Sequence, residues 1–178
     1  MNKHEVVAVT SRSFCKNGNL VNELKKYYSK VILNETGKTL AAKDLIDFLA
    51  KADKAIIGIE DMSSDTLAQV PNLKVISKYG VGINNLDLAF LKSKGVKLGF
   101  TQGVNKQSVA ELALTLTLLS LRKIHRNHTE IVEGRWSQEK GAELFGKTVG
   151  LLGFGNIGQK LASLLKSRRV PILCPCFS

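Results

Sequence analysis

Apolar residues in the first hundred positions gather in short, β-branched runs. The runs lie at residues 6–9, 31–33, 55–59, 75–77 and 96–98. Apart from Gly58, Ser77 and Lys97 the runs are continuously apolar, which is typical of strands buried on both faces. Segments at 20–28 and 41–49 repeat apolar residues at helical spacing. This alternation predicts an α/β fold whose first domain, residues 1–102, is a flavodoxin-like, doubly wound parallel sheet.

A turn near residue 99 leads into a long apolar segment. Ser108 and Glu111 have the spacing of a capping box, which predicts that a helix begins near Ser108 and continues to Ile124. Its apolar run, residues 109–121, is too short to cross a bilayer and is interrupted by Glu111. We therefore expect a buried linking helix and not a membrane span.

The chain turns polar after Arg126, and two further apolar runs, at 148–152 and 170–173, predict strands. A helical segment that ends near Lys166 lies between them. This order is typical of the start of a Rossmann domain. Residues 103–178 are therefore expected to hold the linking helix and an incomplete dinucleotide-binding domain.

Six residues directly after the run at 148–152 match the dinucleotide-binding pattern G-x-G-x-x-G. They are Gly153, Phe154, Gly155, Asn156, Ile157 and Gly158. The pattern follows a predicted strand and opens a predicted helix, as its chemistry requires. Gly155 would let a pyrophosphate approach the backbone, and Gly158 would let the helix pack closely on the sheet. A glycine turn without a ligand is the alternative.

A P-loop pattern, G-x-x-x-x-G-K-[ST], occurs at residues 141–148 and would indicate an ATPase or GTPase. A P-loop follows a strand and opens a helix, whereas this segment follows a polar stretch and precedes a strand. The order of elements argues against a P-loop NTPase.

A second glycine turn follows the run at 75–77. In a parallel sheet its backbone N–H groups would lie at the carboxyl end of the strands, where they can bind an anion. With Lys78 adjacent, a substrate carboxylate is the natural ligand of Gly80, Val81 and Gly82. A plain turn is again the alternative.

An ordered series of motifs resembles the D-isomer-specific 2-hydroxyacid dehydrogenases, the phosphoglycerate-dehydrogenase-like group. The motifs are SKYGVGINN at 77–85, GVN at 103–105, SVAE at 108–111, GRW at 134–136 and GKTVG at 146–150, which continues into 153–158. The resemblance covers residues 5–173. It implies NAD-dependent hydride transfer between C2 of a small 2-hydroxy or 2-keto acid and the nicotinamide, with the protein orienting both reactants.

The resemblance also implies roles for single residues. The loop of Gly80, Val81 and Gly82 would bind the substrate carboxylate, Asn105 would lie beside the active-site cleft, and residues 153–158 would bind the NAD pyrophosphate. It further implies a homodimer formed through the linking helix and the start of the cofactor domain.

The sequence departs from the family near its end. Arg168 and Arg169 stand where the family has a glycine-containing turn, and Cys176 stands at the position of the acidic residue that binds the ribose hydroxyls. A frameshift, a premature stop or a deliberate cut is the expected origin of this ending. NAD binding by the chain is therefore expected to be weak or absent.

No catalytic residue is assigned. The family's catalytic arginine, its carboxylate partner and its acid–base histidine would all lie beyond residue 178, and none of the three histidines takes that place. They are His4, His125 and His128. The chain is thus expected to be a truncated, inactive dehydrogenase. A non-enzymatic association or binding module is the main alternative, and a P-loop NTPase has less support.

Composition excludes several other classes. The chain has 26 Lys and Arg against 15 Asp and Glu, a net charge of +11 that would attract small anions. The basic residues are scattered and no nucleic-acid-binding motif accompanies them. Three cysteines are too few for a disulfide framework, and Cys174 with Cys176 is not a metal site. With no signal segment, a cytoplasmic protein is expected.

Overall fold

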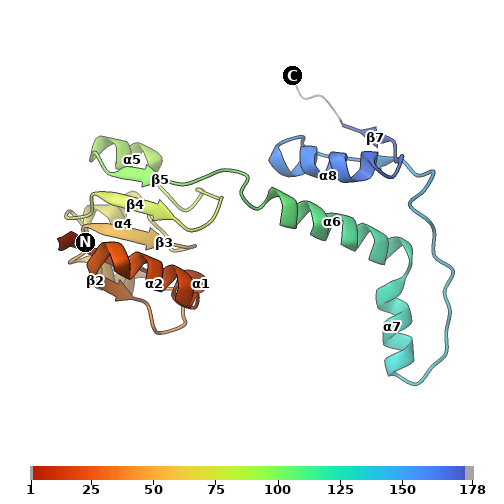
Figure 1. Ribbon diagram of the computed structural model, residues 1–178, viewed down its shortest axis with the longest axis horizontal. Coiled ribbons are helices and arrows are strands. Elements are labelled where there is room, and N and C mark those ends of the chain that lie inside the picture. Colours follow the sequence, from red (N-terminus) through yellow and green to blue (C-terminus); the bar gives the residue numbers. More distant parts are fainter. Residues whose placement is uncertain (1, 175–178) are drawn as a thin grey trace. The chain divides into compact units, whose positions relative to one another are not determined.

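The computed structural model describes residues 2–174 and divides into two compact units, residues 1–102 and 103–178. In the first unit five parallel strands form one sheet. They are β1 (Asn2–Val9), β2 (Tyr28–Leu33), β3 (Lys54–Ile57), β4 (Val75–Lys78) and β5 (Lys97–Gly99). Their order in the sheet is β2-β1-β3-β4-β5 (Figure 1). This is the flavodoxin-like order, so the predicted fold class is confirmed.

Helices pack on both faces of this sheet. They are α1 (Arg12–Cys15), α2 (Gly18–Tyr27), α3 (Ala42–Leu49), α4 (Ser64–Ala68) and α5 (Leu88–Ser93). Successive strand residues point to opposite faces. Val9 accordingly packs with Phe14 and Val21 of α1 and α2, whereas its neighbour Ala8 packs in the cluster that holds Leu45 of α3. Two separate apolar cores therefore hold the sheet between its helices.

The prediction that every strand is buried on both faces is wrong for the two edge strands. β2 and β5 each pair on one side only, and neither contains a fully buried residue. The run at 55–59 is also shorter as a strand than predicted, because β3 ends at Ile57 and Ile59 lies in a loop, 68 % exposed. Tyr28, placed in a helix by its spacing, begins β2 instead.

The second unit contains α6 (Lys106–Leu121), α7 (Ile124–Val132), β6 (Val149–Gly150), α8 (Asn156–Lys166) and β7 (Ile172–Leu173). The strands β6 and β7 pair in parallel, and α6 runs alongside α8 (Figure 1). Leu114 and Leu165 are buried at the centre of the core between these elements. The strands lie where the apolar runs predicted them, but each has only two residues.

The capping-box prediction is wrong. The helix α6 begins at Lys106, with Asn105 as its N-cap residue, so Ser108 lies inside the first turn. The hydroxyl of Ser108 donates to the carbonyl oxygen of Asn105 at 3.0 Å, and the Glu111 carboxylate accepts from Gln107.

The linking helix also ends earlier than predicted. Lys123 adopts a left-handed conformation (φ +54°) and separates α6 from α7. α7 then continues the helical structure to Val132, beyond the polar turn that the sequence indicated after Arg126.

The prediction that the linking helix is buried is wrong for one of its faces. Ala110 and Leu114 are buried in the second unit, on the side of α6 that packs on α8. Leu112 and Leu116, one helical turn apart, are 56 % and 55 % exposed. The run at 109–121 is apolar nearly all round, and α8 covers only one side of it.

Candidate functional site

The glycine loop after β4 presents free hydrogen-bond donors at the carboxyl edge of the sheet. Gly80 has φ +146°, a conformation that favours glycine. Tyr79 N–H donates to the carbonyl of Ile57 at 2.8 Å, which fixes the start of the loop. Among the described residues, the N–H groups of Gly80, Val81 and Gly82 have no acceptor, and these residues line a cavity of about 340 Å³. The loop can therefore donate to an anion.

Lys78 is engaged within the protein. Its ammonium donates to the carbonyl of Gly58 and, at 2.8 Å, to Oδ1 of Asn85. Burial lowers the pKa of Lys78 from its ordinary value, and the nearby Glu60 carboxylate acts in the opposite direction. Lys78 lines the cavity of the glycine loop, and it also ties that loop to the one after β3.

Asn85 completes this connection and was missed as a site residue by the sequence analysis. Its Nδ2 donates to the carbonyl of Glu60 at 2.5 Å, while its Oδ1 accepts from Lys78. The two loops therefore hold each other in place through one amide and one ammonium. The only sequence signal was an Asn a few residues after the glycines.

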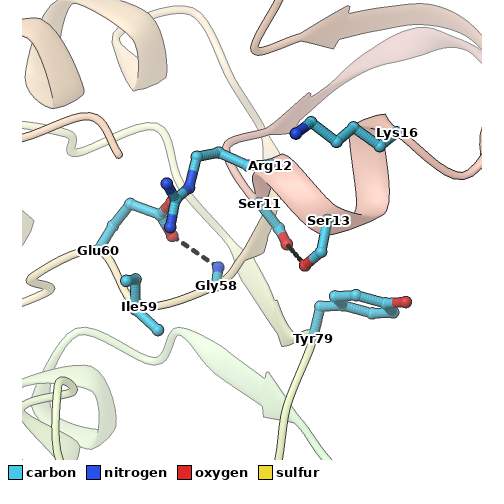
Figure 2. Close-up of a pocket in the computed structure, with 8 residues that line it drawn as sticks. All are labelled: Ser11, Arg12, Ser13, Lys16, Gly58, Ile59, Glu60 and Tyr79. Carbon is cyan, nitrogen blue, oxygen red and sulfur yellow. Dashed lines mark hydrogen bonds between the residues drawn. The ribbon is translucent and has the colours of Figure 1, made fainter. Parts of the chain in front are cut away.

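A second cavity, of about 260 Å³, adjoins the first, and Figure 2 shows the residues that line it. Its lining comes from the residues that follow β1 and β3, together with Tyr79. The lining residues are Ser11, Arg12, Ser13, Lys16, Gly58, Ile59, Glu60 and Tyr79. Gly58, Ile59 and Tyr79 line both cavities. In this strand order β1 and β3 flank the switch point, where parallel α/β sheets commonly bind ligands.

The fingerprint residues 153–158 meet at one turn of the second unit. Gly153 has φ +96°, and Gly155 is the N-cap of α8, where no side chain caps the helix. A Cβ added at Gly155 would meet nothing within 4 Å, whereas one at Gly158 would lie 2.5 Å from the Gly153 carbonyl oxygen. An open approach at Gly155 and close packing at Gly158 are what a pyrophosphate site requires.

The turn that carries Asn105 lies near this fingerprint. A Cβ added at Gly103 would come within 2.9 Å of Cγ of Asn156, the first residue of α8. The structure therefore brings the start of α6 next to the start of α8 within the second unit. The glycine loop at 80–82 belongs to the first unit. Binding of the substrate carboxylate by this loop, and the place of Asn105 beside the active-site cleft, stay predictions.

The two fingerprint glycines should respond differently to alanine. We expect Gly158→Ala to destabilise the second unit by about 1–3 kcal/mol, because its Cβ would collide with backbone. Gly155→Ala is the matched control and should leave stability within about 0.5 kcal/mol. Hydrogen exchange of the α8 amides measures both variants. Equal protection in the two variants would contradict the packing role of Gly158.

Other candidate chemistry finds no support. Residues 141–148 lead directly into the strand β6 and do not open a helix, whereas a P-loop follows a strand and opens a helix. In residues 2–174 no cluster of three or more His, Cys, Asp or Glu could hold a metal ion. Cys176 lies outside the described residues. None of the described helices combines the length and apolarity needed to cross a membrane.

Comparison with known proteins identifies the family. A profile described as "D-isomer specific 2-hydroxyacid dehydrogenase, catalytic domain" matches residues 7–163. The chain belongs to this family. It is 38 % identical over 137 residues to hydroxypyruvate reductase of Thermotoga maritima, an alignment that covers 75 % of this chain and 45 % of that protein. The resemblance inferred from the motifs is confirmed.

A second relative and one solved structure are also similar to this chain. D-3-phosphoglycerate dehydrogenase of Methanocaldococcus jannaschii is 31 % identical over 144 residues, 76 % of this chain and 28 % of that protein. D-lactate dehydrogenase of Aquifex aeolicus, solved with NAD and lactic acid, has the same fold (TM-score 0.80, 23 % identity, 97 % of this chain, 51 % of that one). The chain spans about half the length, or less, of these three proteins.

Proposed function

We propose that the chain carries the substrate-binding part of an NAD-dependent 2-hydroxyacid dehydrogenase, which transfers a hydride between C2 of a small 2-hydroxy or 2-keto acid and NAD. The observation that carries this proposal is the set of free N–H groups at Gly80, Val81 and Gly82. They line a cavity at the carboxyl edge of the sheet, where a substrate carboxylate can accept from them. The names of the relatives, hydroxypyruvate reductase and D-3-phosphoglycerate dehydrogenase, support this substrate class.

The residues at 153–158 fit the pyrophosphate of NAD. The cofactor, when bound, supplies the hydride acceptor or donor. The chain contributes the uncapped start of α8 and the open backbone at Gly155. Within these 178 residues no Asp or Glu follows Glu143, so this polypeptide offers the ribose hydroxyls no carboxylate side chain after the fingerprint. We propose that the 178-residue polypeptide by itself binds NAD weakly and does not turn over substrate.

A charge placed in the glycine loop tests the carboxylate site. D-lactate should bind the polypeptide with a dissociation constant of roughly 1 mM, and Gly82→Asp should weaken binding at least tenfold, about 1.4 kcal/mol, because two carboxylates would repel each other. Calorimetry measures both. Neither Gly82 nor Gly18 has an atom within 4 Å of an added Cβ. Gly18→Asp therefore serves as the matched control and should bind as the parent does. Equal binding by the two variants would contradict the site.

The exposed face of α6 favours a second property, self-association. Leu112, Leu116 and Leu119 follow one another at helical spacing on one side of α6 and are all exposed. Contiguous apolar surface of this kind commonly marks a protein interface. We propose that a second copy of the chain covers this face, in agreement with the dimer that the family resemblance implies.

Substitutions on the leucine face test this association. The parent polypeptide should sediment as a dimer at micromolar concentration, and the double variant Leu112→Gln, Leu116→Gln should sediment as a monomer, because it removes two apolar contacts from the centre of the face. Leu88→Gln is the matched control, since Leu88 is also exposed, at 45 %, but lies in the first unit. A monomeric parent would overturn the proposed dimer.

A further inference from the structure

A further cavity, of about 120 Å³, lies at the amino ends of β4 and β5. Leu73 on its wall precedes β4 by two residues, and Val96 directly precedes β5. The glycine loop follows the other end of β4. The cavity shares no lining residue with the two at the carboxyl edge, so it is separate from the proposed substrate site.

The wall of this cavity is part of the apolar core of the first unit. Seven of its eight lining residues are apolar. Leu67, Val70 and Leu73 are buried members of the core cluster that also holds Leu45 of α3, and the partly buried Phe90 packs against this cluster. The hydrophobic effect would therefore favour an apolar group placed among these side chains.

Lys94 is the charged residue among the eight that line the cavity. It is the C-cap of α5, and Gly95, in the left-handed conformation (φ +68°), turns the chain from there into β5. Nζ of Lys94 lies 5.5 Å from the centre of the Phe90 ring, which also lines the cavity. Within residues 2–174 Lys94 forms no salt bridge. An ammonium without a counter-charge thus lies beside an apolar space.

Two more lysines lie next to lining residues in the chain. Lys74 follows Leu73 and Lys97 follows Val96, and the N–H of Lys97 donates to the carbonyl of Lys74 at 2.9 Å. The Lys74 ammonium pairs with Asp53 at 2.8 Å, whereas Lys97 forms no salt bridge within the part of the chain that the structure describes. The charge near the cavity is therefore positive, which favours an anion.

We propose that this cavity binds a short aliphatic carboxylate, with its tail among the buried leucines and its carboxylate paired with Lys94. In another protein an apolar cavity of roughly 150 Å³ holds benzene, so a cavity of about 120 Å³ suits a short alkyl tail. A neutral alkane would leave the ammonium without a counter-charge, and a small polar anion would leave the apolar wall in water. This inference does not depend on the proposed function.

Backbone amide shifts of ¹⁵N-labelled polypeptide test the site, with hexanoate, hexan-1-ol and acetate as probes. Hexanoate should cause saturable shifts around the cavity, at residues 67–73 and 94–96. Each buried methylene strengthens binding by about fourfold, so acetate should bind about tenfold or more weakly. Hexan-1-ol should bind about threefold more weakly than hexanoate, because it cannot form an ion pair with Lys94.

Matched variants locate the two ends of the ligand. Lys94→Gln should weaken hexanoate about threefold and leave hexan-1-ol unchanged, whereas Lys92→Gln, on the same helix but outside the lining, should change neither. Ala68→Phe should weaken hexanoate about tenfold or more, because Ala68 is an exposed residue of the lining and the ring would fill the cavity. Ala89→Phe, at an exposed position of α5 outside the lining, should bind as the parent does.

The variant Gly82→Asp separates this site from the carboxylate site on the glycine loop, and the shifts at 67–73 and 94–96 should persist in it. Hexanoate shifts confined to residues 80–82, or equal binding of hexanoate and acetate, would overturn the site. Equal binding of hexanoate and hexan-1-ol, or a preference for hexanoate that survives in Lys94→Gln, would overturn the assignment of a carboxylate ligand. Each of these results would leave the proposed function intact.

Discussion

The purified 178-residue polypeptide should oxidise no NADH above the buffer rate when mixed with pyruvate, glyoxylate or hydroxypyruvate. No histidine lines either cavity described at the sheet edge. His125 and His128 are exposed on α7 in the second unit, and His4 lies toward the amino end of β1, away from the carboxyl edge. A positioned acid or base contributes about 10²–10⁴-fold to rate, and oriented reactants about 7–11 kcal/mol. Without these contributions we expect the polypeptide to have no measurable dehydrogenase activity.

Absorbance at the NADH band, followed over hours at high protein concentration, measures this result. Hydroxypyruvate reductase of Thermotoga maritima, the 38 % identical relative, serves as the active control. The variant Gly155→Val, prepared in parallel, distinguishes activity of the chain from activity of a contaminant, because a contaminant would oxidise NADH at equal rates in both samples. Robust turnover that Gly155→Val abolishes would contradict the proposed inactivity.

NADH should show no saturable binding to the polypeptide below about 1 mM at physiological salt. The start of α8 and the open backbone at Gly155 can still accept the pyrophosphate. This polypeptide has no Asp or Glu after Glu143 for the ribose, however, and a missing charged hydrogen bond costs roughly 1.5–3 kcal/mol. Each 1.4 kcal/mol is about tenfold in affinity, so loss of this bond and of the surrounding pocket would move a micromolar site to millimolar.

Titration of NADH by calorimetry, at low and at physiological salt, separates specific from diffuse binding. The net charge of +11 should attract NADH only at low salt, because salt screens such a field. Tight binding that resists salt and disappears in Gly155→Val would show that the second unit is a competent cofactor site, against this expectation.

The sheet of the first unit could be predicted because each strand is a short β-branched run with helical spacing between the runs. The burial of single strands could not be predicted, because it depends on the position of each strand in the sheet, and β2 and β5 lie at the edges. The burial of α6 could not be predicted either. Its residues are apolar nearly all round, so the sequence could not tell which face α8 covers.

The glycine loop and the fingerprint could be predicted as sites because each is a local pattern next to a predicted strand. The cavity of Arg12, Lys16 and Glu60 could not, because residues 12 and 60 meet only through the parallel pairing of β1 with β3. The engagement of Lys78 also depends on a distant partner, the carbonyl of Gly58 twenty residues earlier. Local spacing placed Lys78 beside the anion site without showing what its ammonium binds.

Backbone amide shifts of ¹⁵N-labelled polypeptide during a D-lactate titration show directly whether the free N–H groups at 80–82 hold the substrate carboxylate. The amides of Gly80, Val81 and Gly82 should shift most, in a saturable way, and the shifts should disappear in Gly82→Asp and persist in Gly18→Asp. Saturable shifts confined to other parts of the chain, or no shift at 80–82 up to about 50 mM ligand, would contradict this role of the loop, since a millimolar site would be filled at that concentration.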